Sequence, residues 1–499
     1  MRFHAEARRD RYDLIVVGSG IGGLTAAALL AQAGLGVLVV ERHDRVGGYA
    51  HAFRRGRRIF DASVHVVGGS VVPRLLARLG VAERCPLLPV DPLYDAVYPG
   101  FTLRAPAGLD AFLEAHTALF PGEAKGLRNL VQACRDIRRE AERAEELISP
   151  VDVMQRPGRY PTLLRLRRAT LESVLDAHLT DPRARAAFAT LWPYLGLPPS
   201  RVSFLYWATM LLSAVEEGGF ACQGSFQRLA DTLAQAVVGR GGEVLLRSPV
   251  RRIRVEDGAV AGVVLENGQV IDAPRVISNA DALQTFFELV GPEHLPLRTI
   301  RALRRLEPSV SAFVVYAAAR LDLPGLGLGH ETFFYPGSDH EEAFAGTLAG
   351  SPSWWTATVP TGLDPTLAPE GEHLVILTTL VASGATRRWR DVKDAMTERM
   401  LDAAAARIPG LRDALTFAEG ATPRTLERYT RNTGGAIYGF DVSPRQVGPG
   451  RPGPETEVRG LYLAGHWSKP GGGITGVALS GVLAARAIAG VGLGDPRPG

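Results

Sequence analysis

The chain of 499 residues is 46% apolar and has a formal net charge of +4. This composition can fill large cores, and it lacks the clustered basic residues with interleaved aromatics that a nucleic-acid surface requires. We therefore expect a globular protein with no nucleic-acid partner, and the sequence carries no signal for an oligomeric state.

The first predicted elements are a strand, a tight glycine turn, a helix and a second strand. The β-branched run LIVV ends at a glycine, the Ala- and Leu-rich stretch after it has helical spacing, and VLVV ends at Glu41. Gly18, Gly20 and Gly23 fit G-x-G-x-x-G: the first allows the turn, the second lets the backbone approach a pyrophosphate, and the third lets helix pack on strand. Glu41 can accept hydrogen bonds from ribose hydroxyls, and the helix N-terminus favours phosphate.

A second glycine pair selects the dinucleotide. RHDRVGGYA after Glu41 adds Gly47 and Gly48, a further close backbone approach, and it resembles the extended fingerprint of FAD-binding proteins of the glutathione reductase structural class. The resemblance implies FAD and an α/β fold, in which a Rossmann-like FAD-binding domain carries an inserted α+β substrate domain. The contacts predicted here are Gly18, Gly20, Gly22, Gly23, Glu41, Arg42, Gly47 and Gly48.

Two later segments complete the predicted cofactor domain. Residues 241–281 alternate apolar and polar side chains and contain DG and NG turn signals, which predicts a β-meander that returns to the Rossmann sheet. Residues 460–490 predict a strand, a glycine turn and a helix that begins near Gly473, where the helix dipole would favour negative charge on a reduced flavin ring. The contacts predicted here are Val250, which by resemblance to relatives grips adenine through its backbone, and Gly465, Gly473, Ile474 and Thr475.

The predicted substrate domain consists of residues 71–218 and 282–424, and the cofactor domain of residues 1–70, 219–281 and 425–499. The first inserted segment is expected to be mostly helical, and the second holds the strand candidates SVSAFVVYAAAR and EHLVILTTLVAS. No second strand, G-x-G-x-x-G and helix unit follows, because GLGLGH lacks a helix after it. We therefore expect that NADH and NADPH do not reduce the flavin rapidly.

Three motifs carry a more specific resemblance. They are GGYAHAFRRGRRIFDASVHVVGG at 47–69, NTGGAIYGFDVSP at 432–444 and LYLAGHWSKPGGGITGVALSG at 461–481. With them the chain resembles the carotenoid desaturase, carotenoid isomerase and retinol saturase family of FAD enzymes. The resemblance implies a long apolar polyene or isoprenoid substrate that is bound mainly by burial. One residue departs from the pattern of many flavoproteins of this class, since His466 stands where they place an acid.

The resemblance implies desaturation of a carotenoid or related isoprenoid, with hydride transfer to flavin N5. An isomerase would instead use reduced flavin with no net redox change, and a saturase would run hydrogen in the opposite direction. An amine oxidase shares the fold and the C-terminal flavin helix, but its fuller pattern is not found in this sequence. The alternative of another class is a prenyl-binding protein resembling GDP dissociation inhibitors, against which the intact glycines and Glu41 argue.

The candidate catalytic residues come from the matching motifs. His65 and His466 could exchange a proton near neutral pH, and Trp467 could lie against the flavin. The structural alternatives are a satisfied core histidine and wall packing, and for each histidine the structural alternative is favoured. No metal site is expected. The other candidates near the flavin are Asp61, Tyr438 and Lys469.

The cysteines and the apolar runs indicate the compartment. Cys85, Cys134 and Cys222 lie far apart without a C-x-x-C motif, which predicts neither a disulfide framework nor a thiol redox pair. MRFHAEARRD lacks the apolar core of a signal peptide, and the longest apolar run, 204–215, is shorter than the roughly 20 residues that cross a bilayer. We expect a cytoplasmic location. Residues 156–175 combine Arg, Leu and Tyr at near-helical spacing, so peripheral contact at the inner face of the cell membrane is an alternative to a surface helix docked on the substrate domain.

Overall fold

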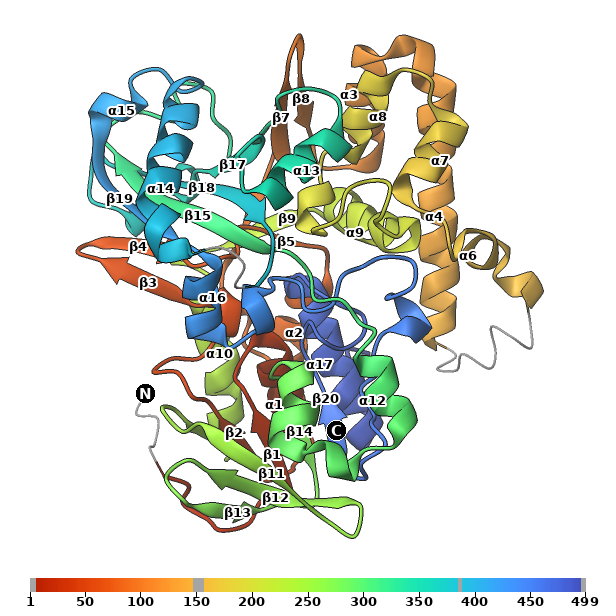
Figure 1. The fold of residues 1–499 in the computed structure, drawn as a ribbon, viewed down its shortest axis with the longest axis vertical. Helices are drawn as coiled ribbons and strands as arrows, with labels where there is room; N and C mark the ends of the chain where they lie inside the picture. The colour runs from red at the N-terminus through yellow and green to blue at the C-terminus, as the bar shows by residue number, and fades with distance from the viewer. Residues whose placement is uncertain (1–5, 147–156, 385–387, 495–499) are drawn as a thin grey trace.

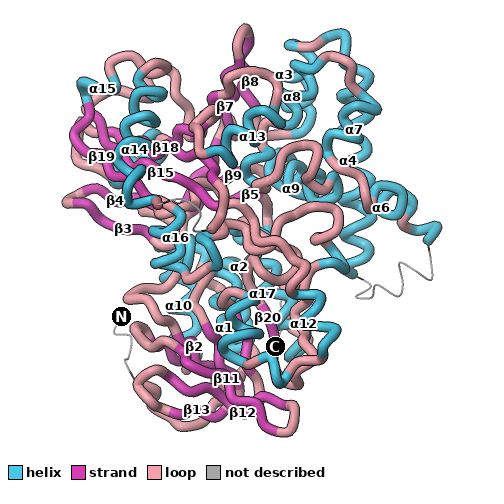
Figure 2. Tube along the Cα trace, viewed as in Figure 1, coloured by secondary structure: helices cyan, strands magenta, loops and turns pink. Residues whose placement is uncertain are grey.

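The computed structural model describes residues 6–146, 157–384 and 388–494, which form two stacked halves (Figure 1). The lower half in that view contains the first strands and the C-terminal helix, and the upper half contains a larger sheet with helices beside it. Helices gather on one side of the upper half and strands on the other (Figure 2). Segments that are distant in the sequence meet where the halves join.

A five-stranded parallel sheet forms the centre of the lower half, in the order β10-β2-β1-β14-β20. Its strands are short apolar runs with nearly every residue buried, as expected for a parallel sheet covered on both faces. α1 packs tightly on α17, because a Cβ on Gly481 would overlap the carbonyl oxygen of Gly22. The bounds are β1 Leu14–Val17, β2 Val37–Val40, β10 Glu243–Leu245, β14 Val276–Ser278, β20 Leu461–Leu463, α1 Ile21–Gln32, α10 Gln227–Val238 and α17 Ile474–Ala489.

The strand, turn, helix and second strand predicted at the start of the chain are confirmed, and so is the β-meander. The strands of the meander pack on one face of the parallel sheet, where Ile253 and Val263 share a hydrophobic core with Ile15 and Leu38. α1, α10 and α17 cover the other face. The meander consists of β11 Val250–Glu256, β12 Ala259–Leu265 and β13 Val270–Asp272, in antiparallel order.

The upper half contains a seven-stranded sheet in the order β19-β15-β18-β17-β16-β7-β8. Both strand candidates of the second inserted segment are confirmed as β15 and β18, which pair along their whole length. The prediction that the first segment is mostly helical missed β7 and β8, which join this sheet through the parallel pair of β7 and β16. The bounds are β7 Tyr94–Tyr98, β8 Phe101–Ala105, β15 Ser311–Ala319, β16 Glu331–Phe334, β17 Trp355–Thr358, β18 His373–Val381 and β19 Leu415–Ala421.

The two faces of this sheet have different neighbours. One face, with Phe313 and Val315, packs against Trp389 and Met396 of α14. The other face, with Ala312 and Val314, turns to the helices of the first inserted segment and to the interior. The helices that the first inserted segment contributes to this half are α3 Leu109–Leu119, α4 Ala124–Glu146, α6 Pro161–Leu166, α7 Leu171–His178, α8 Pro182–Ala189 and α9 Phe204–Glu217. The second segment contributes α13 His340–Ala349, α14 Trp389–Ala405 and α15 Leu411–Ala414.

Two small sheets connect the halves. One is the hairpin of β3 Ala52–Arg55 and β4 Arg58–Asp61, and the other contains β9 Gly219–Cys222 between β5 Val67–Gly68 and β6 Leu87–Val90. The pairing of β6 with β9 brings the Sγ atoms of Cys85 and Cys222 to 3.9 Å as free thiols. The sequence gives no signal for this contact, because it depends on the long-range pairing of β6 with β9.

The segment at 156–175 is not one helix. Residue 156 lies outside the described residues, and the remainder forms a short 3-10 turn, α6 and α7. Thr170 ends the first part and caps α7, since its side chain accepts a hydrogen bond from the Ser173 backbone N–H. An uninterrupted interfacial helix is thus absent from the described part of this segment.

The domain boundaries remain a proposal. Strands from both inserted segments pair in one sheet, which supports a substrate domain built from the two. However, α2 Val71–Arg78 packs in the cofactor core, and so do Phe286 and Leu303 on the other side of the sheet. We propose that α2 and the stretch that contains Phe286 and Leu303 belong to the cofactor domain.

Candidate active site

The glycine turn after β1 forms a cradle around the side chain of Asn279. Gly20 is the N-cap of α1, and a Cβ on it would lie 2.6 Å from Asn279 Nδ2. Asn279 follows β14, and its Oδ1 accepts a hydrogen bond of 2.8 Å from the Gly23 backbone N–H. Gly23 also permits close packing on β1, as predicted, because an added Cβ would lie 2.5 Å from the Gly18 carbonyl oxygen. Asn279 has no local sequence signal, because it reaches the glycine turn only through the pairing of β14 with β1.

Glu41 organises the next turn. Its carboxylate accepts hydrogen bonds from the Ser19 backbone N–H at 2.8 Å, the Ser19 Oγ at 2.7 Å and the His43 backbone N–H at 2.7 Å. Glu41 is 8% exposed, and it lines the large cavity described below. The carboxylate still has acceptor capacity, so the position fits the predicted contact with a ribose hydroxyl.

Glu41→Ala is expected to weaken FAD binding. Each lost hydrogen bond to a charged group is worth about 1.5–3 kcal/mol, which corresponds to roughly tenfold or more in the dissociation constant. The measurement is titration of deflavinated protein with FAD, followed by flavin fluorescence. Glu83→Ala removes an exposed acid far along the chain and should leave the titration unchanged. Equal affinity of Glu41→Ala and the unaltered protein would refute the role given to Glu41.

The second glycine pair lies directly on the first turn. Gly47 N–H donates to the Ser19 carbonyl oxygen at 2.9 Å, and a Cβ on Gly48 would lie 3.2 Å from the Gly20 Cα. Tyr49 follows, and its hydroxyl donates to the carbonyl oxygen of Ala436 at 3.0 Å. The expected close backbone approach is therefore present. The hydrogen bond of Tyr49 connects this turn to the motif at 432–444.

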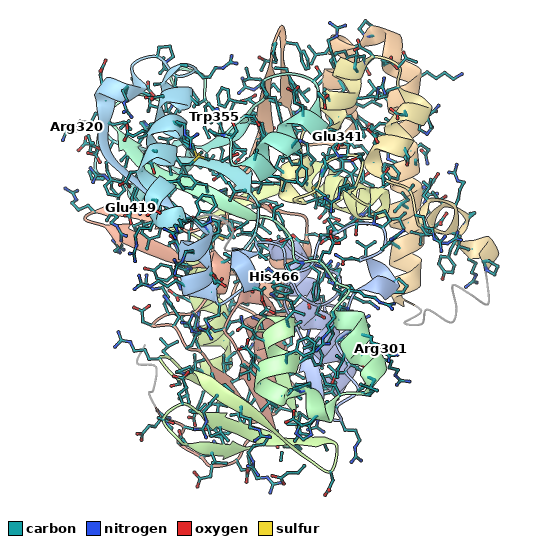
Figure 3. All side chains as sticks on the ribbon, viewed as in Figure 1. Arg301, Arg320, Glu341, Trp355, Glu419 and His466 are labelled. Atoms are coloured by element: carbon teal, nitrogen blue, oxygen red, sulfur yellow. The ribbon has the colours of Figure 1, made fainter. Side chains whose placement is uncertain are left out.

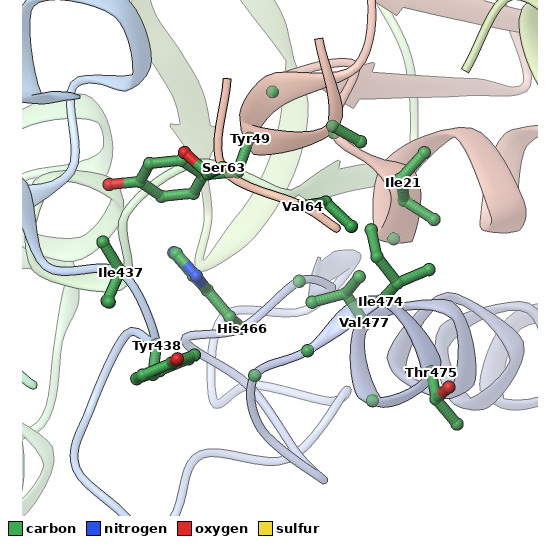
Figure 4. A pocket seen from close by; sticks show the side chains of 18 of the residues that line it. Ile21, Tyr49, Ser63, Val64, Ile437, Tyr438, His466, Ile474, Thr475 and Val477 are labelled. Carbon is green, nitrogen blue, oxygen red and sulfur yellow. The ribbon is translucent and has the colours of Figure 1, made fainter. Parts of the chain in front are cut away.

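Asn432 joins the NTGG motif to the C-terminal GHW motif. Its Oδ1 accepts a 2.7 Å hydrogen bond from the Trp467 indole N–H and lies 3.1 Å from His466 Nε2. Because an indole N–H can only donate, the shared atom of Asn432 is the carbonyl oxygen, and the His466 Nε2 must then carry the proton. The His466 ring lies toward Tyr49, with centroids 5.8 Å apart, and has Ile437 and Tyr438 on its other side (Figure 4).

These contacts surround a cavity of about 990 Å³ at the centre of the molecule. His466 is drawn there in the middle of the molecule, between the two halves (Figure 3). Trp467 and Gly23 do not line the cavity, and neither do the further candidates Asp61 and Lys469; Trp467 packs edge-on against Phe440. The predicted residues that line it are Gly18, Gly20, Gly22, Glu41, Arg42, Gly47, Gly48, His65, Val250, Gly465, His466, Gly473, Ile474 and Thr475.

Burial keeps both candidate histidines neutral. It lowers the pKa of His65 and of His466 to about 3, and the buried guanidinium of Arg451 adds to the effect at His466. Burial thus favours the structural alternative for both residues, and a part in proton exchange stays a prediction. At His466 the ring proton is also engaged by Asn432, so this side chain is held in place rather than free to exchange a proton.

The N-terminus of α17 opens into the cavity. Gly473 is its N-cap and Thr475 Oγ1 donates to the carbonyl oxygen of Gly68, which fixes the first turn against β5. The free backbone N–H groups of such a terminus favour negative charge. The other candidates lie differently: Asp61 accepts a hydrogen bond from the Phe226 backbone N–H, and burial lowers the pKa of Lys469.

The upper end of the cavity is formed by the inner face of the seven-stranded sheet. Apolar and aromatic side chains line it, among them Val314, Phe333, Trp354 and Leu380. Glu331 on β16 is the acid in this wall: it is 1% exposed and accepts a 2.7 Å hydrogen bond from Thr358 Oγ1. Burial raises its pKa to about 8, so the carboxyl is protonated at neutral pH.

Glu331 should make stability depend on pH. The folded protein holds this proton more tightly than the unfolded chain, so the contribution of the residue is complete below the ordinary carboxyl pKa and is lost as the pH rises to about 8. Relative to Glu331→Gln, the free energy of unfolding should fall by about 1.4 kcal/mol per pH unit in that window. Thermal midpoints of the two proteins between about pH 5 and pH 8 test this, and parallel curves would contradict it. The facing titratable groups, Tyr194 and Tyr438, stay neutral in this window because burial raises their pKa values.

The donor set fits a flavin dinucleotide. A glycine cradle at a helix N-terminus, a carboxylate after the second strand, and a second helix N-terminus beside a long apolar cavity are the parts that FAD requires. The fold and the site define an FAD-dependent oxidoreductase.

The chain belongs to the flavin containing amine oxidoreductase family, whose model matches residues 21–489. The likeness to amine oxidases therefore extends beyond the fold and the C-terminal helix to which the sequence analysis limited it. The chain is 27% identical to prolycopene isomerase 1 of an Oncidium hybrid cultivar, over 96% of this chain and 84% of that one. It is 29% identical to a neurosporene-forming phytoene desaturase of Rhodobacter capsulatus, over 95% and 93%.

Solved structures share the fold. An oxidoreductase from Methanosarcina mazei superposes with a TM-score of 0.64 at 19% identity, over 95% of this chain and 99% of that one. A redesigned putrescine oxidase superposes with a TM-score of 0.66 at 17% identity, over 96% and 99%. Among the described residues no helix is long and apolar enough to span a membrane.

Proposed function

We propose that this protein desaturates a carotenoid or a related long isoprenoid. The observation that carries the proposal is the cavity of about 990 Å³, which continues from the glycine cradle to the apolar face of the seven-stranded sheet. Relatives named phytoene desaturase and prolycopene isomerase support the substrate class. A polyene has few polar groups, so a wall of apolar side chains is what its binding requires.

The chain itself binds, orients and excludes water. When bound, FAD supplies an acceptor for a hydride from carbon. We assign FAD binding to the glycine cradle, Glu41 and the N-terminus of α17, whose partial positive charge favours a negatively charged reduced ring. Side chains such as Leu380 and Phe333 bind the polyene by burial, at about 25 cal/mol per Å² of apolar area. His466 and Trp467 hold the cavity wall through Asn432.

A single anaerobic turnover tests the direction of the reaction. Oxidised protein is mixed with a candidate polyene, and flavin absorbance and product are followed together. Desaturation requires loss of flavin absorbance matched one to one with new double bonds. Product formation only after prior reduction of the flavin, with absorbance unchanged across turnover, would establish isomerisation instead. Recovery of absorbance as a double bond disappears would establish a saturase.

The isomerase remains the second candidate because the prolycopene isomerases match 96% of this chain. The residues described here suit both reactions, since each needs a bound flavin and an apolar cavity. The turnover experiment separates them without altering the fold or cofactor assignment.

We also propose peripheral contact with an anionic membrane surface. Four arginines are exposed in residues 157–168, and the leucines of the same stretch are half-buried. Such a basic surface is attracted to anionic lipid, and a water-insoluble substrate has to be taken up from a membrane. The arginines are Arg159, Arg165, Arg167 and Arg168.

Vesicle sedimentation tests this contact. The protein should pellet with vesicles that contain phosphatidylserine and remain in solution with pure phosphatidylcholine vesicles. Replacement of all four arginines by glutamine should abolish the difference. Equal partitioning of the protein on both vesicle types would contradict the proposal.

A further inference from the structure

A row of polar side chains crosses the otherwise apolar inner face of the seven-stranded sheet. The register pairs Glu331 with Thr358 and Phe333 with Thr356, and Thr356 pairs in turn with Thr378 of β18. Glu331 and Phe333 are two residues apart on one strand, so their side chains share a face, and these threonines lie on the same face. Glu331, Thr356 and Thr378 line the cavity.

One group of this row lacks a partner. The Oγ1 atom of Thr378 is buried and makes no hydrogen bond within the described structure, although it belongs to a residue that lines the cavity. Thr358 donates to one oxygen of Glu331, and the Thr356 side chain also hydrogen-bonds to this carboxyl, but neither contact involves Thr378. A buried hydroxyl without a partner costs free energy, which a polar ligand atom would recover.

The polar row lines the same cavity as the proposed cofactor site, so a ligand bound beside the cofactor would contact it. The ring of Tyr438 lies against Gly472, next to the N-cap of α17. Tyr438, Tyr194 and Glu331 all line the same cavity. The polar row therefore faces the same interior space as the groups assigned to the flavin.

We propose that Glu331, Thr356 and Thr378 form a binding site for a hydroxyl group, so that the substrate is a hydroxylated isoprenoid rather than a pure hydrocarbon. This inference rests on the proposed function, which supplies the polyene part of the substrate. A protonated carboxyl offers one O–H donor and a carbonyl acceptor, and the threonine hydroxyl can take either role. An alcohol is both donor and acceptor, so it satisfies both groups at once. A hydrocarbon would leave the row buried against apolar carbon.

The experiment compares two polyenes of equal conjugated length, one with a terminal hydroxyl and one without. For each, the dissociation constant is measured by the change in the absorbance of bound FAD, and kcat/KM is measured separately. The unaltered protein should prefer the alcohol by roughly tenfold or more, because a site built for a hydroxyl rejects the analogue that lacks it.

Two variants and a matched control locate the preference. Thr378→Val and Glu331→Leu should each reduce the ratio toward one by weakening binding of the alcohol, with the hydrocarbon bound as before or better. Thr332→Val is the control: the Thr332 hydroxyl is also buried without a partner, but it lies on the opposite face of β16, and Thr332 is not among the cavity-lining residues. It should leave the ratio unchanged.

The outcomes separate this inference from the proposed function. A ratio near one in the unaltered protein, or a ratio that Thr378→Val and Glu331→Leu leave intact, overturns the hydroxyl site, and turnover of the hydrocarbon would then leave the proposed function standing. If neither polyene is turned over but the alcohol binds with a preference that Thr378→Val removes, the hydroxyl site stands and the proposed function fails. Thr378→Val preserves side-chain shape, so its result does not depend on how well Glu331→Leu folds.

Discussion

Gly20→Val should give a folded protein that loses its FAD. The position caps α1, and a Cβ there already lies 2.6 Å from Asn279 Nδ2, before the two further methyl groups of valine are counted. Those methyl groups would occupy the cradle in which we propose that the backbone meets the pyrophosphate. Overpacking of this kind costs about 1–3 kcal/mol, or roughly ten- to a hundredfold in the dissociation constant of FAD.

The measurement is the ratio of flavin absorbance to protein absorbance after desalting, together with an FAD titration. Gly122→Val is the matched control, because Gly122 has no atom within 4 Å of an added Cβ and has an ordinary backbone conformation. Circular dichroism and the thermal midpoint show whether each variant is folded. A folded Gly20→Val protein with full FAD content would refute the assignment of the cradle.

The cofactor half could be predicted from the sequence because its signals are local. A strand, three glycines at fixed spacing, a helix and Glu41 fall within about 30 consecutive residues, and each has a physical requirement that few residue types meet. The same is true of the C-terminal helix, where Gly473 precedes a long apolar stretch. The structure places nearly all of these residues on one cavity.

The remaining site residues have no local signal. Asn279 reaches the glycine cradle because β14 pairs with β1, and Asn432 reaches Trp467 across 35 residues. Glu331 is the first residue of the short strand β16, and its burial depends on β7 and β17 lying on either side. β7 and β8 form a local antiparallel hairpin around Pro99 and Gly100, which a turn signal could have found, and only the pairing of β7 with β16 depends on the other inserted segment.

A buried arginine connects the segments that form the cavity wall. Arg451 is 2% exposed, and its Nη atoms donate to five backbone carbonyl oxygens at 2.5 to 3.2 Å. The carbonyl groups belong to Tyr438, Phe440, Asp441, Gln446 and His466. A guanidinium can hold several acceptors at fixed angles and remains charged when buried. The side chain of Arg451 therefore fixes residues 438–446 relative to His466.

Arg451→Met should therefore destabilise the protein strongly and loosen the flavin site. Methionine fills much of the volume but leaves the five carbonyl oxygens without their donor in a dry interior, and loss of a buried charged partner costs about 3–5 kcal/mol. Because two of those carbonyls belong to Tyr438 and His466, which line the cavity, FAD should be released at a lower temperature together with the loss of structure. The measurement is the thermal midpoint by circular dichroism and by flavin fluorescence. Arg445→Met, at an exposed position six residues earlier, should leave both midpoints in place. If Arg451→Met melted like Arg445→Met, the five hydrogen bonds could not be what holds these wall segments together.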